Sequence, residues 1–162
     1  MYEAYAAEML TSSDGILWKE RKTATDGTHS TEWSDLNLKL SGPVLGLFPI
    51  FIDMVPDTLY FPLNEKFPAV EFFYKSVDDK LIGFQVTRQG KLRKIVKSSA
   101  YRDFLKRMSL EDPSKVILKL IPIPSLASVS SIEFTLAKGE VEFVMPTEVF
   151  VVQVPLKYGD KE

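Results

Sequence analysis

The sequence predicts one α/β domain in which a central β-sheet is covered by a helix. Residues 69–76 and 81–88 are two strand-like runs joined by a short polar turn, which is typical of a β-hairpin. Residues 95–108 follow with an apolar stripe at helical spacing. A dense apolar run at 116–121 then predicts an interior strand. The 162 residues suffice for a single domain with a core, and we expect it to be a piece of a longer protein.

The residues before the hairpin predict smaller elements. Residues 2–10 are expected to form a short helix, and a strand is expected to begin at 16–18. Alternating leucines within 36–40 predict a half-buried strand. Five prolines within 42–68 predict irregular structure there, with a short strand near 58–61.

The last third of the chain predicts further strands. Runs at 132–136 and 141–145 flank a Lys138-Gly139 turn and indicate a second hairpin, and 148–155 is expected to be a final strand.

Composition narrows the function classes. The chain has no cysteine, which excludes disulfides, thiolate nucleophiles and cysteine-based zinc sites. No apolar run reaches about 18 residues, so no membrane span is predicted. The net charge is −2, so any binding to nucleic acid must come from a local patch.

The hairpin places polar residues opposite each other. With residues 77–79 as its loop, Glu71 lies opposite Gln85, and Thr87 projects from the same face. Opposed side chains lie about 5 Å apart, so a carboxylate and an amide oxygen there could share a hard cation such as Mg²⁺. The alternative is a polar pair on the surface of a hairpin, without any ligand.

A basic cluster follows the hairpin. The stretch from Arg88 to Arg107 contains eight basic residues and one acid, Asp103, which is a net charge of +7. Its basic members are Arg88, Lys91, Arg93, Lys94, Lys97, Arg102, Lys106 and Arg107. Such a cluster could neutralise several phosphates of DNA. The alternative is an ordinary solvated helix face.

The middle of the chain resembles a known family. Leu59–Phe73 reads LYFPLNEKFPAVEFF and Leu81–Thr87 reads LIGFQVT, and together they are similar to a signature of the Crinkler and retrotransposon-hotspot proteins. In that group a PL…FPxxD/E segment leads into a strand, and a GFQxT or LFQxT strand follows. Tyr2-Glu3 is similar to the start of the family's first helix. The resemblance implies a restriction-endonuclease-like core of the PD-(D/E)xK superfamily, a central mixed sheet flanked by helices.

The resemblance also implies a site. Carried over by position, Glu3 is the helix acid, Glu71 the metal-binding acid and Gln85 the second ligand of an Mg²⁺ ion. Thr87 occupies the position where the superfamily has lysine, so catalysis would need a cation from elsewhere, such as Lys91. An amide at Gln85 supplies no charge, so we expect weak Mg²⁺ binding and little or no nuclease activity.

These features support a nuclease-like DNA-binding domain, with a location in the nucleus implied by the resemblance. The second interpretation is a catalytically inactive protein-interaction module that kept the nuclease fold. The third is a small antiparallel β-rich binding domain that is unrelated to nucleases.

Overall fold

The computed structural model describes residues 2–11, 18–23, 33–36, 38–64, 67–88, 93–123, 131–135 and 148–153. They form helices α1 (Tyr2–Thr11) and α2 (Ser98–Arg107), the short 3-10 turns η1 (Phe51–Asp53) and η2 (Pro113–Lys115), and the strands β1 (Trp18–Thr23), β2 (Ser34–Leu36), β3 (Ser41–Leu45), β4 (Thr58–Phe61), β5 (Phe72–Lys75), β6 (Leu81–Arg88), β7 (Arg93–Lys97), β8 (Val116–Ile123), β9 (Ser131–Thr135) and β10 (Glu148–Gln153).

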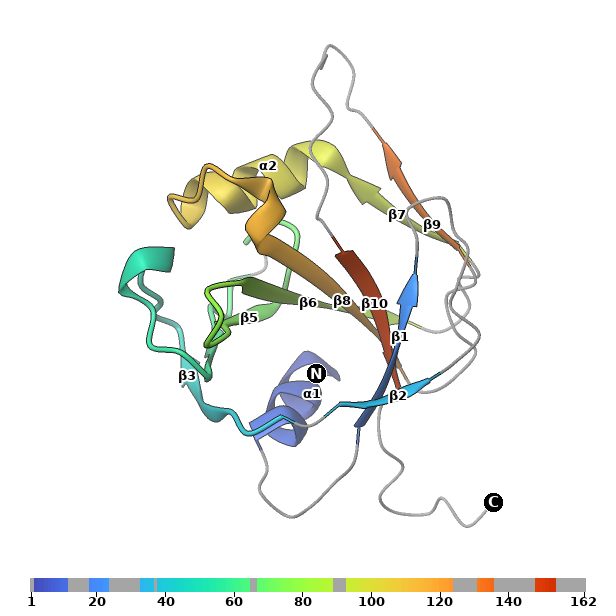
Figure 1. The fold of residues 1–162 in the computed structure, drawn as a ribbon, viewed down its shortest axis with the longest axis horizontal. Helices are drawn as coiled ribbons and strands as arrows, with labels where there is room; N and C mark the ends of the chain where they lie inside the picture. The colour runs from blue at the N-terminus through green and yellow to red at the C-terminus, as the bar shows by residue number, and fades with distance from the viewer. Residues whose placement is uncertain are drawn as a thin grey trace.

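One curled sheet of eight strands forms the centre of the described part of the molecule (Figure 1). The strands follow the order β2-β1-β10-β8-β6-β5-β4-β3. The sheet is mixed, because β8 runs parallel to both β6 and β10, whereas β5 is antiparallel to β4 and β6. A separate pair, β7 and β9, is parallel. The predicted α/β class is confirmed at this level, as a mixed sheet with few helices.

The predicted hairpin and its register are confirmed. Phe72 lies opposite Phe84, as the expected loop requires. The turn closes where it was expected, since the N–H of Ser76 donates to the carbonyl of Lys80 at 2.9 Å. The first strand is shorter than predicted and begins at Phe72. The chain bends before it, because Ala69 has a φ of 69°, which lies outside the β region.

The predicted helix at 95–108 is confirmed from Ser98 onward, but its first residues are strand β7 instead. The prediction was wrong there because Ile95 and Val96 are β-branched and suit a strand, and both pair with β9. The buried side of the helix and its end consists of Tyr101, Phe104, Leu105 and Met108.

The position of α2 follows from strand direction. Because β6 and β8 are parallel, the chain between them must cross one face of the sheet, and α2 lies in this crossover. Gly83 of β6 allows the close approach. A Cβ atom there would lie 2.7 Å from Cγ1 of Val70 and 3.6 Å from Cε2 of Phe104.

Apolar clusters cover the sheet on both sides, and the two helices lie on opposite sides of it (Figure 1). The side that we call the α2 face includes Phe67, Val70, Phe73, Leu81, Tyr101, Phe104, Leu118 and Leu120. The side that we call the α1 face includes Ala6, Ala7, Leu10, Phe72, Tyr74, Ile82, Phe84 and Ile121. Successive residues of β6 and β8 therefore alternate between the faces, as strand geometry requires.

The other predicted elements are present in part. The first helix is confirmed as α1, the interior strand as β8 and the last strand as β10. The strand expected over 36–40 is wrong in extent, since β2 ends at Leu36, although Leu40 is buried. The first strand of the predicted second hairpin is present as β9, which pairs with β7, whereas its predicted turn and second strand at 136–147 lie outside the described residues. No helix among the described residues is long and apolar enough to cross a membrane.

Candidate functional site

Gln85 lies on the α2 face of the central strand β6. Its partner across the parallel ladder is Leu120, which belongs to the α2-face cluster, and paired residues share a face. The side-chain oxygen Oε1 of Gln85 is buried and accepts no hydrogen bond from the part of the chain that is described. A buried acceptor without a donor is uncommon and costs free energy, so Gln85 remains a candidate site residue.

Glu71 lies beside the same stretch of β6, just before β5 begins. Its N–H donates to the carbonyl of Phe84 at 2.9 Å, and its carboxylate oxygen Oε1 accepts the N–H of Val86. The side chain thus supplies an acceptor to a strand N–H where the β5–β6 ladder has ended. This is a structural role for the carboxylate that the sequence pattern did not predict.

The structure brings Glu71 to the segment that contains Gln85, but it does not place Glu3 with them. Glu3 lies in α1, whose residues Ala6, Ala7 and Leu10 pack in the α1-face cluster. That helix covers the side of the sheet opposite to Gln85 (Figure 1). The side chain of Glu3 is outside the described residues.

Lys91 is the remaining residue of the predicted catalytic set, and Thr87 and Arg88 precede it in the chain. Thr87 and Arg88 are the last residues of β6, with side chains that are not described, and Lys91 lies outside the described residues.

The oxygen atoms of Glu71 and Gln85 suit Mg²⁺ poorly. Glu71 offers a carboxylate whose Oε1 already accepts the N–H of Val86, and Gln85 offers a neutral amide oxygen. Across the described ranges, no group of three or more His, Cys, Asp or Glu side chains could hold a metal ion. Magnesium gives up its waters reluctantly and is usually bound through charged carboxylates. The described side chains at this position therefore do not form a Mg²⁺ site of the usual kind.

The basic cluster divides between a strand and a helix. Arg93, Lys94 and Lys97 belong to β7, where only the backbone is described, and β7 leads directly into α2. On α2, Lys106 is exposed and Arg102 is partly exposed.

Two shallow hollows flank Lys106. One has a volume of about 310 Å³ and the other about 560 Å³. The first is lined by Pro68, Asp103, Lys106 and Arg107, and the second by Arg102, Leu105, Lys106, Ser109, Leu110, Glu111 and Pro113. Cationic side chains thus lie in and around concave surface, together with the acids Asp103 and Glu111, which reduce the local positive charge.

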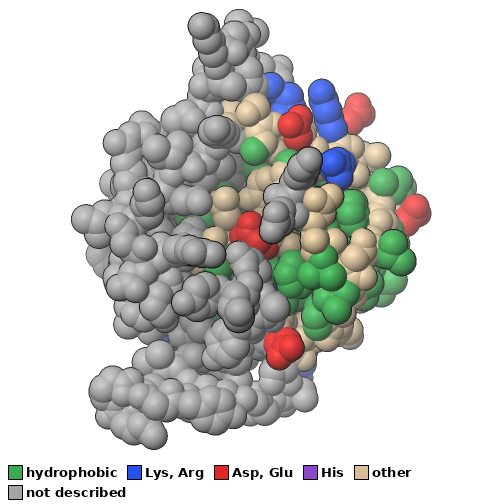
Figure 2. All heavy atoms as spheres, turned by 180° about the vertical axis from the view of Figure 1, so that it is seen from behind, with side chains coloured by type: hydrophobic (Ala, Val, Ile, Leu, Met, Phe, Trp, Pro, Cys, Tyr) green, Lys and Arg blue, Asp and Glu red, His purple; other side chains and the backbone are tan. Residues whose placement is uncertain are grey.

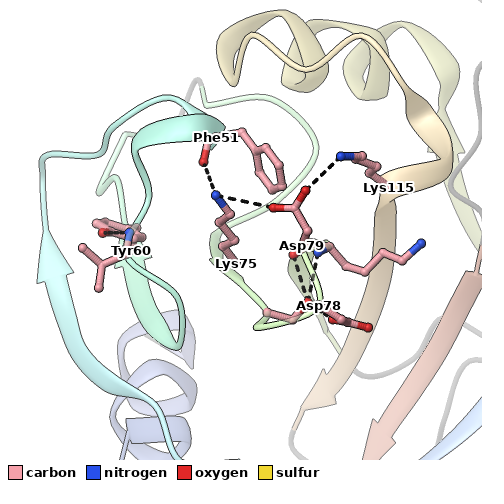
Figure 3. A network of polar contacts seen from close by, with 9 residues as sticks. Phe51, Tyr60, Lys75, Asp78, Asp79 and Lys115 are labelled. Carbon is pink, nitrogen blue, oxygen red and sulfur yellow. Dashed lines mark hydrogen bonds and ion pairs between the residues drawn. The ribbon is translucent and has the colours of Figure 1, made fainter.

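A polar network that the sequence reasoning missed holds the β5–β6 turn against η1 (Figure 3). Lys75 donates to the carbonyl of Phe51 at 3.2 Å, and its Nζ lies 3.6 Å from the carboxylate of Asp79 and 4.6 Å from the centre of the Phe51 ring. Lys115 donates to Asp79 at 2.9 Å. The hydrogen bond from Lys115 and its charge, and then the charge of Lys75, lower the pKa of the Asp79 carboxyl. The Asp78-Asp79 turn was visible in the sequence, and Lys75 lies only four residues before Asp79, but Lys115 lies 36 residues after it and could not be predicted as a partner.

A second missed feature is an ion pair on the α1 face. Lys119 of β8 donates to Glu20 of β1 at 2.8 Å, and the two side chains are only 7% and 15% exposed. The Nζ atom of Lys119 also lies 5.2 Å from the centre of the Phe150 ring. Burial, and then the charge of Glu20, raise the pKa of Tyr74. In the sequence, Lys119 is a single charge within an apolar run, and that was the available signal.

Comparison of the chain with protein-family models, with curated proteins and with solved structures found no match.

Proposed function

We propose that this chain is a DNA-binding domain of the nuclease-like kind that its middle segment resembles, acting in the nucleus and with a degenerate catalytic site. The observation that carries the proposal is the charge of two consecutive elements. From Arg93 to Arg107, β7 and α2 contain six basic residues and one acid, Asp103, in a chain of net charge −2. Phosphate neutralisation by such residues supplies most of the affinity in sequence-independent DNA binding.

The architecture is compatible with this proposal. A mixed sheet with a helix on each side is what the restriction-endonuclease-like core implies, and β7 and β9 form a separate two-stranded sheet beside it (Figure 1). Strand β7 leads directly into α2, so the proposal expects one stretch of DNA backbone to contact both elements. Because the contacts are ionic, binding falls steeply with salt.

The proposal includes little or no nuclease activity. Glu71 supports the backbone of β6, Gln85 carries no charge, and Thr87 stands where the superfamily has lysine. The Mg²⁺ ion that the resemblance implies would be held weakly by Glu71 and Gln85, without Glu3, because α1 packs on the opposite face of the sheet. Loss of one electrostatic contact to the reacting groups typically lowers a rate about a hundredfold or more.

Double-stranded DNA binding is the test. We expect measurable binding by fluorescence anisotropy at low salt, with a log–log salt slope of about −5 if six phosphates are neutralised. Lys94→Glu combined with Lys97→Glu should remove most of this binding. Lys39→Glu combined with Lys80→Glu makes the same change of charge outside β7 and α2, and should leave most of it.

Two results would contradict the proposal in different ways. Equal loss in both double variants, or no binding at low salt, would remove the DNA-binding assignment and favour the protein-interaction module. Mg²⁺-dependent plasmid cleavage that Glu71→Ala abolishes would leave DNA binding in place but would show that the catalytic site is intact.

A further inference from the structure

The segment from β3 to Val55 exposes an unusual amount of aliphatic surface. Its large exposed side chains are Val44, Leu45, Leu47, Ile50, Ile52 and Val55. Leu47 and Ile52 are the most exposed of them, at 78% and 77%. We call these six residues the aliphatic surface. Figure 2, which shows the molecule from behind, has hydrophobic side chains gathered on the side that carries β3 and the segment after it.

This segment is firmly attached to the rest of the molecule. Phe51 and Met54 are buried, and Phe48 is partly buried with its ring edge-on to Phe67 and Phe73, at centroid distances of 5.0 and 5.8 Å. The aromatic and sulfur side chains thus point into the α2-face cluster. The aliphatic residues between them are left on the outside.

Backbone hydrogen bonds hold the same segment at several points. The N–H of Phe51 donates to the carbonyl of Met108 at 2.9 Å, and the N–H of Val55 donates to the hydroxyl of Tyr60 at 3.2 Å. Lys75 donates to the carbonyl of Phe51 (Figure 3). The exposed aliphatic side chains therefore project from a fixed scaffold. A scaffold of this kind loses little conformational entropy when a partner binds.

The composition of the segment favours one class of partner. Residues 44–55 contain a single charged residue, Asp53. Interfaces between independent proteins are about as polar as the rest of the surface, whereas homodimer interfaces are more apolar and depleted in charge. Aliphatic surface is also complementary to itself, as a twofold axis requires.

The exposed area of the aliphatic surface agrees with a homodimer interface. The exposed fractions of the six residues correspond to an area on the order of 600 Å², at the upper end of the patches that monomers leave exposed. Two copies would bury on the order of 1,200 Å² in total, which is the lower limit of a standard specific interface. We infer that the aliphatic surface is the contact between two copies of this chain, related by a twofold axis.

The contact is made by side chains rather than by strand addition. β3 is an edge strand of the sheet, and strands from a second molecule can pair with such edges. Pro43, in the middle of β3, has no N–H to donate, so this edge cannot offer a complete ladder. The interface therefore involves Val44 and Leu45 together with the segment that follows them.

The test is the molar mass of the full chain in solution. Sedimentation velocity over a wide range of concentrations should show a dimer that dissociates on dilution. Leu47→Glu combined with Ile52→Glu should give a monomer at every concentration, because it places like charges in the contact. Both side chains are largely exposed, so the variant should keep its fold, and circular dichroism checks this. Ser34→Glu adds charge at the opposite edge of the sheet and should leave the dimer intact.

A parent chain that is monomeric at all concentrations would overturn the inference, because the aliphatic surface would then not be a contact between two copies. So would a dimer that survives the double substitution while that variant is folded. These results are independent of DNA binding, which the basic residues of β7 and α2 would determine.

Discussion

The two faces of the central sheet differ in whether their buried polar groups have partners. On the α1 face, the charged groups of Lys119 and Glu20 are buried and paired at 2.8 Å. On the α2 face, Gln85 Oε1 and the hydroxyl of Tyr101 are buried without a hydrogen-bond partner among the described residues. Burial raises the pKa of that Tyr101 hydroxyl. One face thus buries an ion pair, and the other buries the neutral oxygens of Gln85 and Tyr101 without a partner. The third such atom among the described residues is Nε of Arg21, whose guanidinium lies 4.6 Å from the centre of the Trp33 ring.

The difference illustrates a general asymmetry in the cost of burial. An isolated charge in an apolar interior costs many times more than an isolated neutral hydroxyl or amide, so a buried charge needs a partner. Removing half of a pair should therefore be far more harmful than removing a group that has no partner.

Lys119→Ala should destabilise the protein by about 3 kcal/mol, because it leaves the carboxylate of Glu20 unpaired in a mostly buried position. Urea denaturation followed by circular dichroism measures this loss. The control is Lys119→Met combined with Glu20→Leu, which removes both charges and keeps most of the volume. We expect the double variant to be much closer to the parent protein. Equal losses in the two variants would show that packing, and not charge, determines the effect.

Gly83→Ala should cost about 1–3 kcal/mol, because the α2 face has no room for the added methyl group. The nearest atom is Cγ1 of Val70, at 2.7 Å from the position of the new Cβ. Val70→Ala removes that atom, so the two substitutions together should cost less than the sum of their separate effects in a double-mutant cycle. Strict additivity in the unfolding free energies would mean that Val70 is not the obstacle.

Tyr101→Phe should change the stability by less than about 1 kcal/mol, and in the direction of greater stability. The hydroxyl that it removes is buried and forms no hydrogen bond within the described part of the chain, so no interaction is lost with it. Thermal unfolding compares the variant with the parent protein. A large destabilisation would show that this hydroxyl does have a partner, and would remove the difference between the faces.

Local patterns predicted the centre of the fold well. The Val77-Asp78-Asp79 loop determines the register of β5 and β6, because a hairpin with a given loop permits only one pairing. The start of α2 was harder to predict, since Ile95 and Val96 fit a helical stripe and a strand equally well. Their strand pairing with β9 depends on residues more than 30 positions away.

The candidate site was predicted only in part, for a similar reason. Register places Glu71 near Gln85, but it does not show that the carboxylate would bind the N–H of Val86 instead of a ligand. The face on which Glu3 lies depends on how α1 packs, which no local pattern specifies. The exposure of Leu47 and Ile52 was equally invisible, because apolar residues are normally expected inside and only packing shows which remain outside.

The place of β10 in the sheet has a consequence for synthesis of the chain. β10 is near the C-terminal end of the sequence, yet it lies between β1 and β8 and joins β1 and β2 to the other strands. Before β10 has been made, β3, β4, β5, β6 and β8 can pair with one another and β1 can pair with β2, but β10 is not yet there to join these two groups of strands. Lys119 then still lacks Glu20, which is 99 residues earlier in the chain. The sheet and its buried ion pair are thus completed only after translation of Glu148–Gln153.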